Sequence, residues 1–405
     1  MIERNGYLQK VFPFIDTDLI KIFTGIRRCG KSVMLDLIKS ELTKKEIDEN
    51  QFISINFEDI ETEKYRDYLK LHEYISEKMK KNEKKTYLFL DEIQEVDGWE
   101  KCVNSLRVKF DCDIYITGSN AKLLSGEFAT YLGGRYVEIT IYPFSFAEFI
   151  ELYKSKDENA SIEKMFKEYL IIGGMPYLKN VGFDYEASIM YLQDLYNSVV
   201  LKDIVQRNKI RSIDLFGRVI KYIISNVGKT FSARSISNYF KNEKIDIAVE
   251  TILNYLQHCE NAHLLNCVRR KDMIGKKILS VNEKYYIADH GLKEALTGKN
   301  QADISMVLEN IIFMELKRRE YKICVGKIND LEIDFIAEKN NSCIYIQVCY
   351  LLASEETIER EFSALEKVKD NFPKFVVSLD EFDMSRNGIR HLNIRDFLLS
   401  SDLSV

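Results

Sequence analysis

Residues 25–32 constrain the fold of this chain more than any other feature. They read Gly25-Ile26-Arg27-Arg28-Cys29-Gly30-Lys31-Ser32, which is the complete pattern G-x-x-x-x-G-K-[ST]. The glycines let the backbone wrap so that successive N–H groups point at phosphate oxygens. A short apolar run precedes the motif and a helical pattern follows it, so the start of that helix adds partial positive charge. The pattern therefore predicts a phosphate-binding loop between a strand and a helix.

This loop predicts a nucleotide site whose ligands are ATP and Mg²⁺. Lys31 is expected to reach the β- and γ-phosphates as a catalytic cation, and Ser32 to place its hydroxyl on Mg²⁺. The side chains of Arg27 and Arg28 receive no separate role. The expected nucleotide contacts are Gly25, Ile26, Arg27, Arg28, Cys29, Gly30, Lys31, Ser32 and Val33.

A second motif supports the same site. Residues 87–92 form an apolar run that ends in two acids, Asp91 and Glu92. A buried strand that stops on carboxylates exposes them at the carboxyl edge of the sheet, where ligands bind in such folds. We expect Asp91 to help hold Mg²⁺ and Glu92 to polarise the attacking water as general base. An isolated acid pair would indicate only a solvated strand end, but the complete phosphate loop favours the catalytic interpretation.

Two further residues are candidates for catalysis. A third apolar run, residues 114–117, leads into Gly118-Ser119-Asn120. We expect Asn120, or alternatively Ser119, to contact the γ-phosphate or the attacking water, while the same position also suits a helix N-cap. Arg135 is a candidate arginine finger that neutralises transition-state charge in its own subunit or in a neighbouring one. A solvated turn arginine is the alternative.

Apolar runs alternate with helical stretches through the first part of the chain. The runs are residues 52–57, 87–90, 114–117 and 136–141. This alternation predicts an α/β fold with a parallel sheet covered by helices on both faces. A polar, turn-like stretch at 154–159 ends the pattern, so we place a P-loop ATPase domain at residues 1–155.

Residues 156–210 are predicted to be a helical lid or linker. Their helical pattern is broken at Gly173-Gly174-Met175-Pro176. We interpret this break as a helix stop followed by a turn that starts at the proline.

Residues 211–300 form a basic segment in an acidic chain. They carry 15 Lys+Arg and 9 Asp+Glu, a net of +6, although the whole chain has a net charge of −5. Three helical patterns, at 215–226, 232–240 and 247–260, precede two strand-like runs joined by a basic turn, which matches a winged helix-turn-helix. The turn suits sequence-independent contact with the phosphates of double-stranded DNA, whereas Glu250 and Glu260 oppose it. Docking of a protein partner is the alternative. The basic hairpin residues are Arg269, Arg270, Lys271, Lys276 and Lys277.

Cysteine usage and hydropathy bear on the compartment. None of the eight cysteines forms a CxxC pair, and the five histidines do not cluster with them. Reduced, mostly buried thiols are therefore expected, as is typical of a cytoplasmic protein. No stretch approaches about 20 apolar residues, so we expect no membrane span. The N-terminus also lacks the apolar run of a signal peptide.

Together these motifs resemble a family of bacterial and archaeal AAA-type ATPases. In that family a P-loop domain is followed by a winged helix and a restriction-nuclease-like domain of unknown function. The resemblance covers nearly the whole chain and implies ATP binding and hydrolysis, but no particular biological role. The matching stretches are residues 23–32, 90–94, 117–120, 133–135 and 173–176.

The last segment, residues 301–405, is expected to be a restriction-nuclease-like domain, and its residues 309–349 resemble a PD-(D/E)xK nuclease core with a degenerate site. The acids of such a core bind metal, and its lysine positions water or stabilises charge. Glu309 fits the helix acid and Asp334 the first strand acid, but Gln347 replaces the second strand acid and Cys349 replaces the lysine. A glutamine is a weaker Mg²⁺ ligand than a carboxylate. We expect a small αββαβ domain without cleavage activity, and ordinary surface or pairing acids are the alternative for Glu309 and Asp334.

The primary hypothesis is an ATP-hydrolysing switch or motor that acts on DNA or on a partner protein and releases ADP. A non-catalytic, nucleotide-bound scaffold, for instance half of a toxin–antitoxin or defence pair, is the first alternative. An ATP-driven nuclease is the second, and Gln347 and Cys349 argue against it. Oligomerisation is compatible with the arginine-finger hypothesis, but the oligomeric state stays open.

Overall fold

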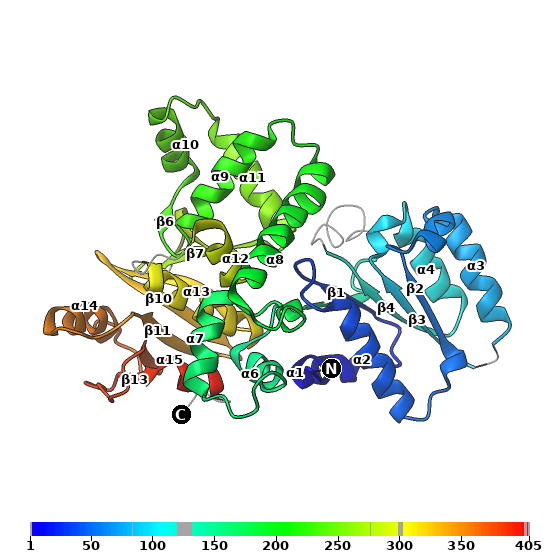
Figure 1. The fold of residues 1–405 in the computed structure, drawn as a ribbon, viewed down its shortest axis with the longest axis horizontal. Helices are drawn as coiled ribbons and strands as arrows, with labels where there is room; N and C mark the ends of the chain where they lie inside the picture. Colours follow the sequence, from blue (N-terminus) through cyan, green and yellow to red (C-terminus); the bar gives the residue numbers. More distant parts are fainter. Residues whose placement is uncertain are drawn as a thin grey trace. The chain divides into compact units, whose positions relative to one another are not determined.

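The structure is a computed structural model that describes residues 2–82, 84–119, 132–275, 277–298, 303–400 and 403. The chain divides into two compact units. The first contains residues 1–143 and 261–263, mostly blue to cyan in Figure 1, and the second contains residues 144–260 and 264–405. Within the described residues, no helix combines the length and apolar character needed to cross a membrane.

The first unit is built on a five-stranded parallel sheet, which confirms the predicted α/β class. The order is β2–β3–β4–β1–β5, and every neighbouring pair is parallel. The strands are β1 (Ile20–Thr24), β2 (Phe52–Asn56), β3 (Thr86–Asp91), β4 (Cys112–Thr117) and β5 (Tyr136–Thr140). The central strands β1, β3 and β4 are buried at every residue, whereas the edge strand β2 alternates. Continuous burial is expected of strands that are covered on both faces.

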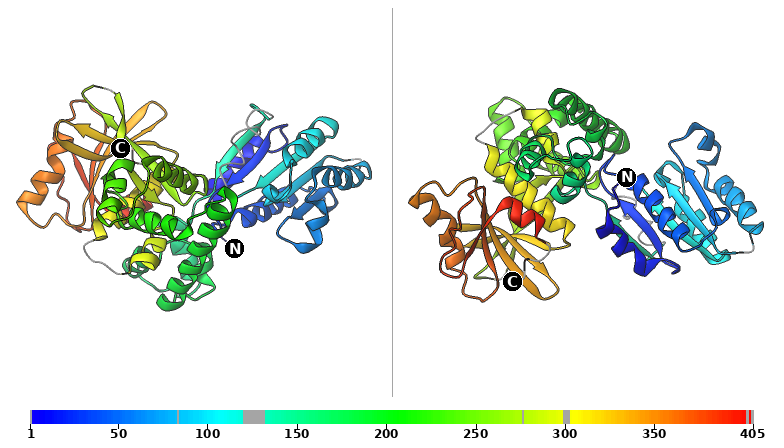
Figure 2. Two further views of the ribbon diagram at one scale, coloured as in Figure 1. Left: turned by 90° about the horizontal axis from the view of Figure 1, so that it is seen from above. Right: turned by 60° about the horizontal axis from the view of Figure 1, so that its bottom comes forward.

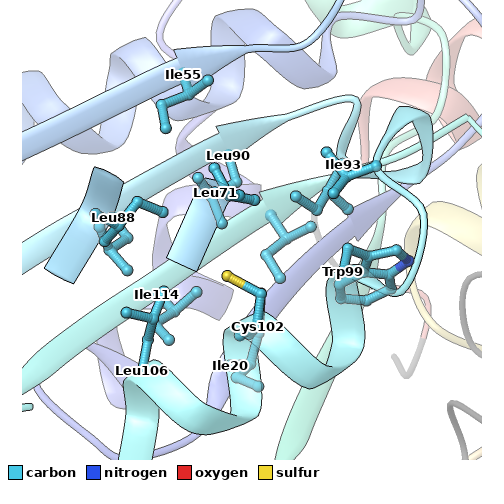
Figure 3. Packing of buried hydrophobic residues seen from close by; sticks show 14 of the residues in the cluster. Ile20, Ile55, Leu71, Leu88, Leu90, Ile93, Trp99, Cys102, Leu106 and Ile114 are labelled. Atoms are coloured by element: carbon cyan, nitrogen blue, oxygen red, sulfur yellow. The ribbon is translucent and has the colours of Figure 1, made fainter. Parts of the chain in front are cut away.

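Among the described residues, four α-helices accompany this sheet, and two of them share its buried core. They are α1 (Asn5–Val11), α2 (Lys31–Lys44), α3 (Tyr68–Lys80) and α4 (Trp99–Lys109). Leu71 of α3 and Leu106 of α4 share one buried cluster with Leu88 and Ile114 of the sheet. Figure 3 shows these side chains converging between the two helices and the strands. The loops that follow β1, β3 and β4 therefore leave a rigid base.

The second unit begins with helices. They are α6 (Phe146–Lys154), α7 (Ile162–Ile172), α8 (Tyr185–Ser198), α9 (Ile213–Ser225), α10 (Ala233–Asn242), α11 (Val249–Asn261) and α12 (His290–Thr297), with a π-helical segment at Val199–Gln206 after α8. The predicted helix stop is confirmed, because α7 ends at Ile172 and a 3-10 helix begins at Pro176. Gly173 has a φ of +76°, and a Cβ there would lie 2.0 Å from Asp289 Oδ1. A side chain at this position would therefore disrupt the end of the helix.

An eight-stranded sheet forms the rest of the second unit. Its order is β13–β12–β11–β10–β9–β7–β8–β6. The strands are β6 (Thr230–Phe231), β7 (Leu265–Asp272), β8 (Lys277–Ile287), β9 (Lys322–Ile328), β10 (Leu331–Lys339), β11 (Ser342–Val348), β12 (Lys374–Ser378) and β13 (Arg390–Asn393). The sheet thus contains strands from both sides of the boundary predicted near residue 300. That boundary, like those near 155 and 210, stays a prediction about domains.

Three helices accompany this sheet: α13 (Ile304–Arg318), α14 (Glu355–Glu366) and α15 (Ile394–Leu399). Phe313 of α13 stacks on Tyr286 of β8 with ring centroids 4.3 Å apart. Phe362 of α14 is buried in a cluster with Ile336 of β10 and Val376 of β12. Figure 2 shows α14, in orange, alongside the strands coloured orange to red. The predicted αββαβ order is therefore extended by β9, β13 and α15, which the sequence analysis missed.

Candidate nucleotide site

The phosphate loop has the backbone shape that its sequence predicts. Thr24 ends β1 and Lys31 begins α2, with Gly30 as the N-cap. Gly25 has a φ of +141° and Gly30 a φ of +103°, which L side chains rarely adopt. A Cβ at Gly25 would also lie 2.2 Å from the carbonyl oxygen of Ile141. Both glycines are therefore required for the wrapped loop, and the N-terminus of α2 opens toward it as an anion site.

Lys31 lies in this loop without a close anionic partner. Its ammonium donates to the carbonyl oxygens of Gly25 at 3.1 Å and Ile26 at 3.3 Å. The nearest carboxylate that it pairs with is Glu92, at 3.7 Å. Because the Lys31 side chain is almost fully buried, a phosphate group would be a far stronger partner than these carbonyls.

The two acids at the end of β3 lie next to the phosphate loop. Asp91, the last residue of β3, accepts a hydrogen bond from the hydroxyl of Thr117. Burial raises the pKa of Asp91, and the neighbouring hydroxyls of Thr117 and Ser32 offset part of that rise. The predicted magnesium ligands Ser32 and Asp91 are thus neighbours, and Lys31 and Glu92 lie beside them.

Thr117 is a site residue that the sequence analysis missed. It ends β4, which lies between β1 and β3 in the sheet. Its hydroxyl donates to Asp91 and accepts the backbone N–H of Glu92 at 2.9 Å. Glu92 has a φ of +55°, so this hydrogen bond stabilises an uncommon backbone conformation at the proposed general base. Thr117 ends the apolar run at 114–117, as Asp91 ends the run of β3. Because β3 and β4 are parallel neighbours, their ends lie side by side, and this would have been the signal for Thr117.

Arg4 is a second site residue that was missed. Its guanidinium is buried and donates to the carbonyl of Cys29 at 3.1 Å and to that of Tyr142 at 2.8 Å. It therefore joins the phosphate loop to the end of β5. No local sequence pattern marks Arg4, since its partners lie 25 and 138 residues away.

The other predicted nucleotide contacts occupy different surroundings. The thiol of Cys29 donates to the carbonyl of Ile141 at 3.1 Å, and burial raises the pKa of this thiol. Arg27 pairs with Glu58 at 3.0 Å, Arg28 has a φ of +63°, and Val33 is exposed. Contact with a nucleotide through these residues stays a prediction, and the Cys29 thiol is bonded to the backbone just after β5.

Arg135 and Asn120 stand apart from this cluster. Asn120 lies outside the described residues, so the sensor hypothesis stays a prediction. Arg135 is exposed and directly precedes β5, where Tyr136 pairs with Ile20 at the start of β1. The phosphate loop begins at Gly25, five residues after Ile20, about 16 Å away along a strand. This position argues against an arginine finger within the same chain, and it leaves two predictions: a role across a subunit interface, or a solvated turn arginine.

The donor chemistry of the site fits Mg²⁺. This ion prefers oxygen ligands and is usually bound by one or two carboxylates together with waters and substrate phosphates. Ser32 and Asp91 supply a hydroxyl and a carboxylate that are neighbours. Among the described residues, no three His, Cys, Asp or Glu side chains gather as a metal cage. A metal ion held by Ser32 and Asp91 would therefore depend on the oxygens of a bound nucleotide.

A second acid–lysine cluster lies in the second unit. The ammonium of Lys284, on β8, contacts Glu309 on α13 at 2.8 Å. It also contacts Glu332 at 2.9 Å and Asp334 at 3.1 Å, both on β10. Burial alone would lower the pKa of Lys284, but the surrounding oxygens of Tyr286 and of these acids raise it well above its usual value. Lys284 was not singled out from the sequence.

The residues that resemble a nuclease site are bonded to other protein groups. Asp334 also accepts the backbone N–H of Val348, and Gln347 donates to Glu361 at 3.0 Å. Cys349, at the position of the family's lysine, is buried, and its thiol cannot supply the positive charge of a lysine. In hydrogen-bond order β7 and β9 separate β8 from β10, a distance of about 14 Å in a flat sheet. Lys284 therefore ties together two strands of a curled sheet.

Comparisons with known proteins agree with this geometry. Residues 17–150 match the AAA domain family, and residues 163–303 match a domain of unknown function, DUF8612. An uncharacterized protein of Haemophilus influenzae is 40% identical over 400 residues, which cover 98% of this chain and 99% of that protein. An uncharacterized protein of Methanocaldococcus jannaschii is 32% identical over 395 residues, which cover 93% of this chain and 85% of that protein.

A solved structure shares the fold. The Walker-type ATPase PABY2304 of Pyrococcus abyssi aligns with a TM-score of 0.52 and 14% identity, covering 73% of this chain and 96% of that one. The phosphate loop, the acids that end β3 and the strand order all lie within the region that matches the AAA domain. The chain therefore belongs to the family of these Haemophilus and Methanocaldococcus proteins, and its N-terminal part is an AAA domain with the fold of a P-loop ATPase.

Proposed function

We propose that this protein binds ATP with Mg²⁺ and hydrolyses it to ADP and phosphate. The observation that carries this proposal is the position of Lys31, which is bonded to the phosphate-loop carbonyl of Gly25 and lies 3.7 Å from Glu92, beside Asp91 and Ser32. A strand end, a helix start and a neighbouring strand place these groups at one edge of a rigid sheet. The arrangement supplies a cation for the phosphates, oxygens for a metal and a carboxylate for a water.

Each residue then has a defined part in hydrolysis. The N–H groups of the loop and the ammonium of Lys31 bind the phosphates and neutralise charge as the γ-phosphoryl group leaves. Glu92 takes a proton from the attacking water. Thr117 holds both Asp91 and the backbone of Glu92, so it positions the metal ligand relative to the base. Mg²⁺, when bound, would supply further neutralisation of the phosphate oxygens.

Two predicted residues complete the proposal. Asn120 acts as the sensor of the γ-phosphate, and Arg135 acts on the nucleotide of a neighbouring subunit. The second role requires an oligomer, because Arg135 lies at the amino end of β5 in its own chain. An Arg135→Ala variant mixed with Glu92→Gln protein would test it, since activity at mixed interfaces should return only if Arg135 acts across subunits.

Coupling to duplex DNA or to a protein partner is the second part of the proposal. Three helices, α9 to α11, precede the β7–β8 hairpin, and β6 pairs with β8, which supports a winged helix-turn-helix at 211–300. However, Arg270 pairs with Glu332 at 3.3 Å and Lys271 with Glu338 at 2.6 Å. These intramolecular pairs reduce the charge available to DNA phosphates, so they favour the protein partner.

The nuclease-like part is proposed to be non-cleaving. Glu309 and Asp334 both contact the Lys284 ammonium, which occupies the space where a shared metal ion would bind. The position of the second acid holds Gln347, whose amide is bonded to Glu361. Metal-dependent nicking that disappears in an Asp334→Ala variant would contradict this part of the proposal.

Steady-state ATP hydrolysis, measured with and without duplex DNA, tests the proposal as a whole. Glu92→Gln serves as the blank, because it removes the base while keeping the size of the side chain. We expect Glu92→Gln to lower kcat about 10³-fold and to leave ATP binding intact. A rate that rises with DNA would identify DNA as the partner. Retention of the wild-type rate in Glu92→Gln would contradict the assignment of the base.

A further inference from the structure

We propose that Gln94 is a second water-positioning residue of this site, which fixes Glu92 with its amide N–H and orients the attacking water with its amide oxygen. This inference rests on the proposed ATP hydrolysis and adds a residue to it. Gln94 lies in the 3-10 helix Ile93–Glu95 that directly follows the two acids of β3.

The first observation is a direct hydrogen bond between the two side chains. The Nε2 atom of Gln94 donates to Oε2 of Glu92. The chemistry fixes the orientation of this amide, because the reverse orientation would place its carbonyl oxygen against a carboxylate, and neither atom can donate. Gln94 therefore restrains the carboxylate of the proposed base.

The second observation concerns the other end of the same amide. The Oε1 atom of Gln94 is buried and, among the described residues, has no hydrogen-bond partner. Leaving a buried acceptor unpaired costs about 1–3 kcal/mol, so such atoms are rare in folded proteins and call for an explanation. Here the unpaired oxygen belongs to a side chain that is bonded to the proposed general base. A hydrogen-bond donor that arrives with the substrates would satisfy it.

The attacking water is that donor. One of its O–H groups faces the Glu92 carboxylate and the other donates to Gln94 Oε1, so that a lone pair of the water oxygen is left for the γ-phosphorus. The new O–P bond forms as the bond from the γ-phosphorus to the bridging oxygen breaks, and ADP leaves with that electron pair. The first water proton passes to Glu92, and phosphate retains the second.

The surrounding structure holds Gln94 in place. Ile93, the first residue of its short helix, and Val96, directly after that helix, are buried in the core of the first unit. The N–H of Glu92 is held by Thr117, and the N–H of Glu95 donates to the carbonyl of Glu92 at 3.1 Å. Because the backbone is fixed on both sides, a shift of the Gln94 side chain and its immediate neighbours is enough to bring Oε1 into contact with a water.

Gln94→Met in the full-length chain provides the test. Methionine keeps the length and approximate volume of glutamine but neither donates nor accepts as the amide does. We expect kcat to fall about 10²-fold, with the affinity for a fluorescent ATP analogue and the unfolding temperature unchanged. Gln94→Glu keeps an acceptor oxygen but loses the N–H donor, and it should also lower kcat. Glu95→Gln, on the same short helix, serves as the matched control and should keep the wild-type kcat.

A double variant separates positioning from mere packing. If Gln94 acts through Glu92 and its water, adding Gln94→Met to Glu92→Gln should lower the single-turnover rate by less than about threefold. A packing role predicts the full loss in both backgrounds. The inference is overturned if the wild type hydrolyses ATP in a Glu92-dependent way while Gln94→Met keeps its kcat, or loses only ATP affinity. Absence of any Glu92-dependent hydrolysis in the wild type overturns the proposed function itself.

Discussion

Lys31 and Lys284 are both buried beside carboxylates, one in each unit, but they are paired very differently. The ammonium of Lys31 contacts two loop carbonyls at 3.1 and 3.3 Å and one carboxylate at 3.7 Å. The ammonium of Lys284 contacts three carboxylates at 2.8, 2.9 and 3.1 Å. One charge is therefore weakly compensated inside its own unit, and the other is fully compensated.

This difference separates a ligand site from a structural clamp. A buried charge is costly unless it is paired and hydrogen-bonded. Lys284 meets that condition within the protein, so it has nothing to gain from a ligand. Lys31 meets it only partly, and the groups around it are suited to phosphate and metal. Both clusters contain a lysine beside acids. How completely the lysine is paired within the protein indicates which of the two clusters can bind a ligand.

The largest effect on folding is expected from Lys284→Met. Removing one partner of a buried ion cluster leaves uncompensated carboxylates, so the free energy of unfolding should fall by about 3–5 kcal/mol. Chemical denaturation followed by circular dichroism measures this change. Lys167→Met is the control, because Lys167 pairs with Glu163 on the exposed surface, where solvent screens the interaction, and its loss should change the free energy of unfolding far less. Equal stability of the Lys284 and Lys167 variants would show that the buried cluster around Lys284 does not act as a structural clamp.

A smaller effect is expected from Arg4→Met in the first unit. The substitution removes the hydrogen bonds to the carbonyls of Cys29 and Tyr142, which hold the phosphate loop against β5. We expect the affinity for ATP to fall about tenfold, or about 1.4 kcal/mol. Titration with a fluorescent ATP analogue measures it, with Lys10→Met on α1 as the control. If the affinities of Arg4→Met and the wild type for the analogue lie within twofold of each other, the phosphate loop keeps its shape without Arg4.

The smallest effect concerns pH. His290 is buried, its Nε2 lies 2.6 Å from the carbonyl oxygen of Tyr169, and burial lowers the pKa of its imidazole. The unfolded chain therefore binds a proton near pH 6.5 that the folded chain does not, so stability falls as pH drops below this value. One such proton contributes a slope of at most about 1.4 kcal/mol per pH unit.

Urea unfolding between pH 5 and pH 7.5 measures this slope. His290→Gln keeps a donor for the Tyr169 carbonyl but does not titrate, so its stability should depend less on pH than that of the wild type. An identical slope in both proteins would show that the buried imidazole is not a source of acid sensitivity in the second unit.

The parts of the site that could be predicted from the sequence are those that lie in short motifs. The loop around Lys31 and the acids Asp91 and Glu92 lie where local patterns place them, because a strand end or a helix start determines their positions. Arg4, Thr117 and Lys284 could not be predicted in this way. Their roles depend on which strands become neighbours and how far a sheet curls, which no local pattern encodes.

The same reasoning applies to the fold. The parallel sheet of the first unit was predicted because its central strands are continuous apolar runs between helices. In the second unit, β9 (Lys322–Ile328) was missed, because lysines at residues 322 and 327 interrupt its apolar pattern. The pairing of β7 with β9 was also not predicted. It spans only residues 270–272 and 325–327, which lie more than 50 residues apart in the sequence.

Thermal unfolding of the wild type and of Lys31→Met, with and without ATP and Mg²⁺, tests whether the Lys31 cluster is the nucleotide site. A ligand at about 100 times its dissociation constant stabilises the folded state by about 2.7 kcal/mol. We expect ATP and Mg²⁺ to raise the unfolding temperature of the wild type, and also that of Lys44→Met at the other end of α2. Lys31→Met should unfold near the unliganded wild type and show no shift. A shift retained in Lys31→Met, or absent from the wild type, would contradict the assignment of the Lys31 cluster as the nucleotide site.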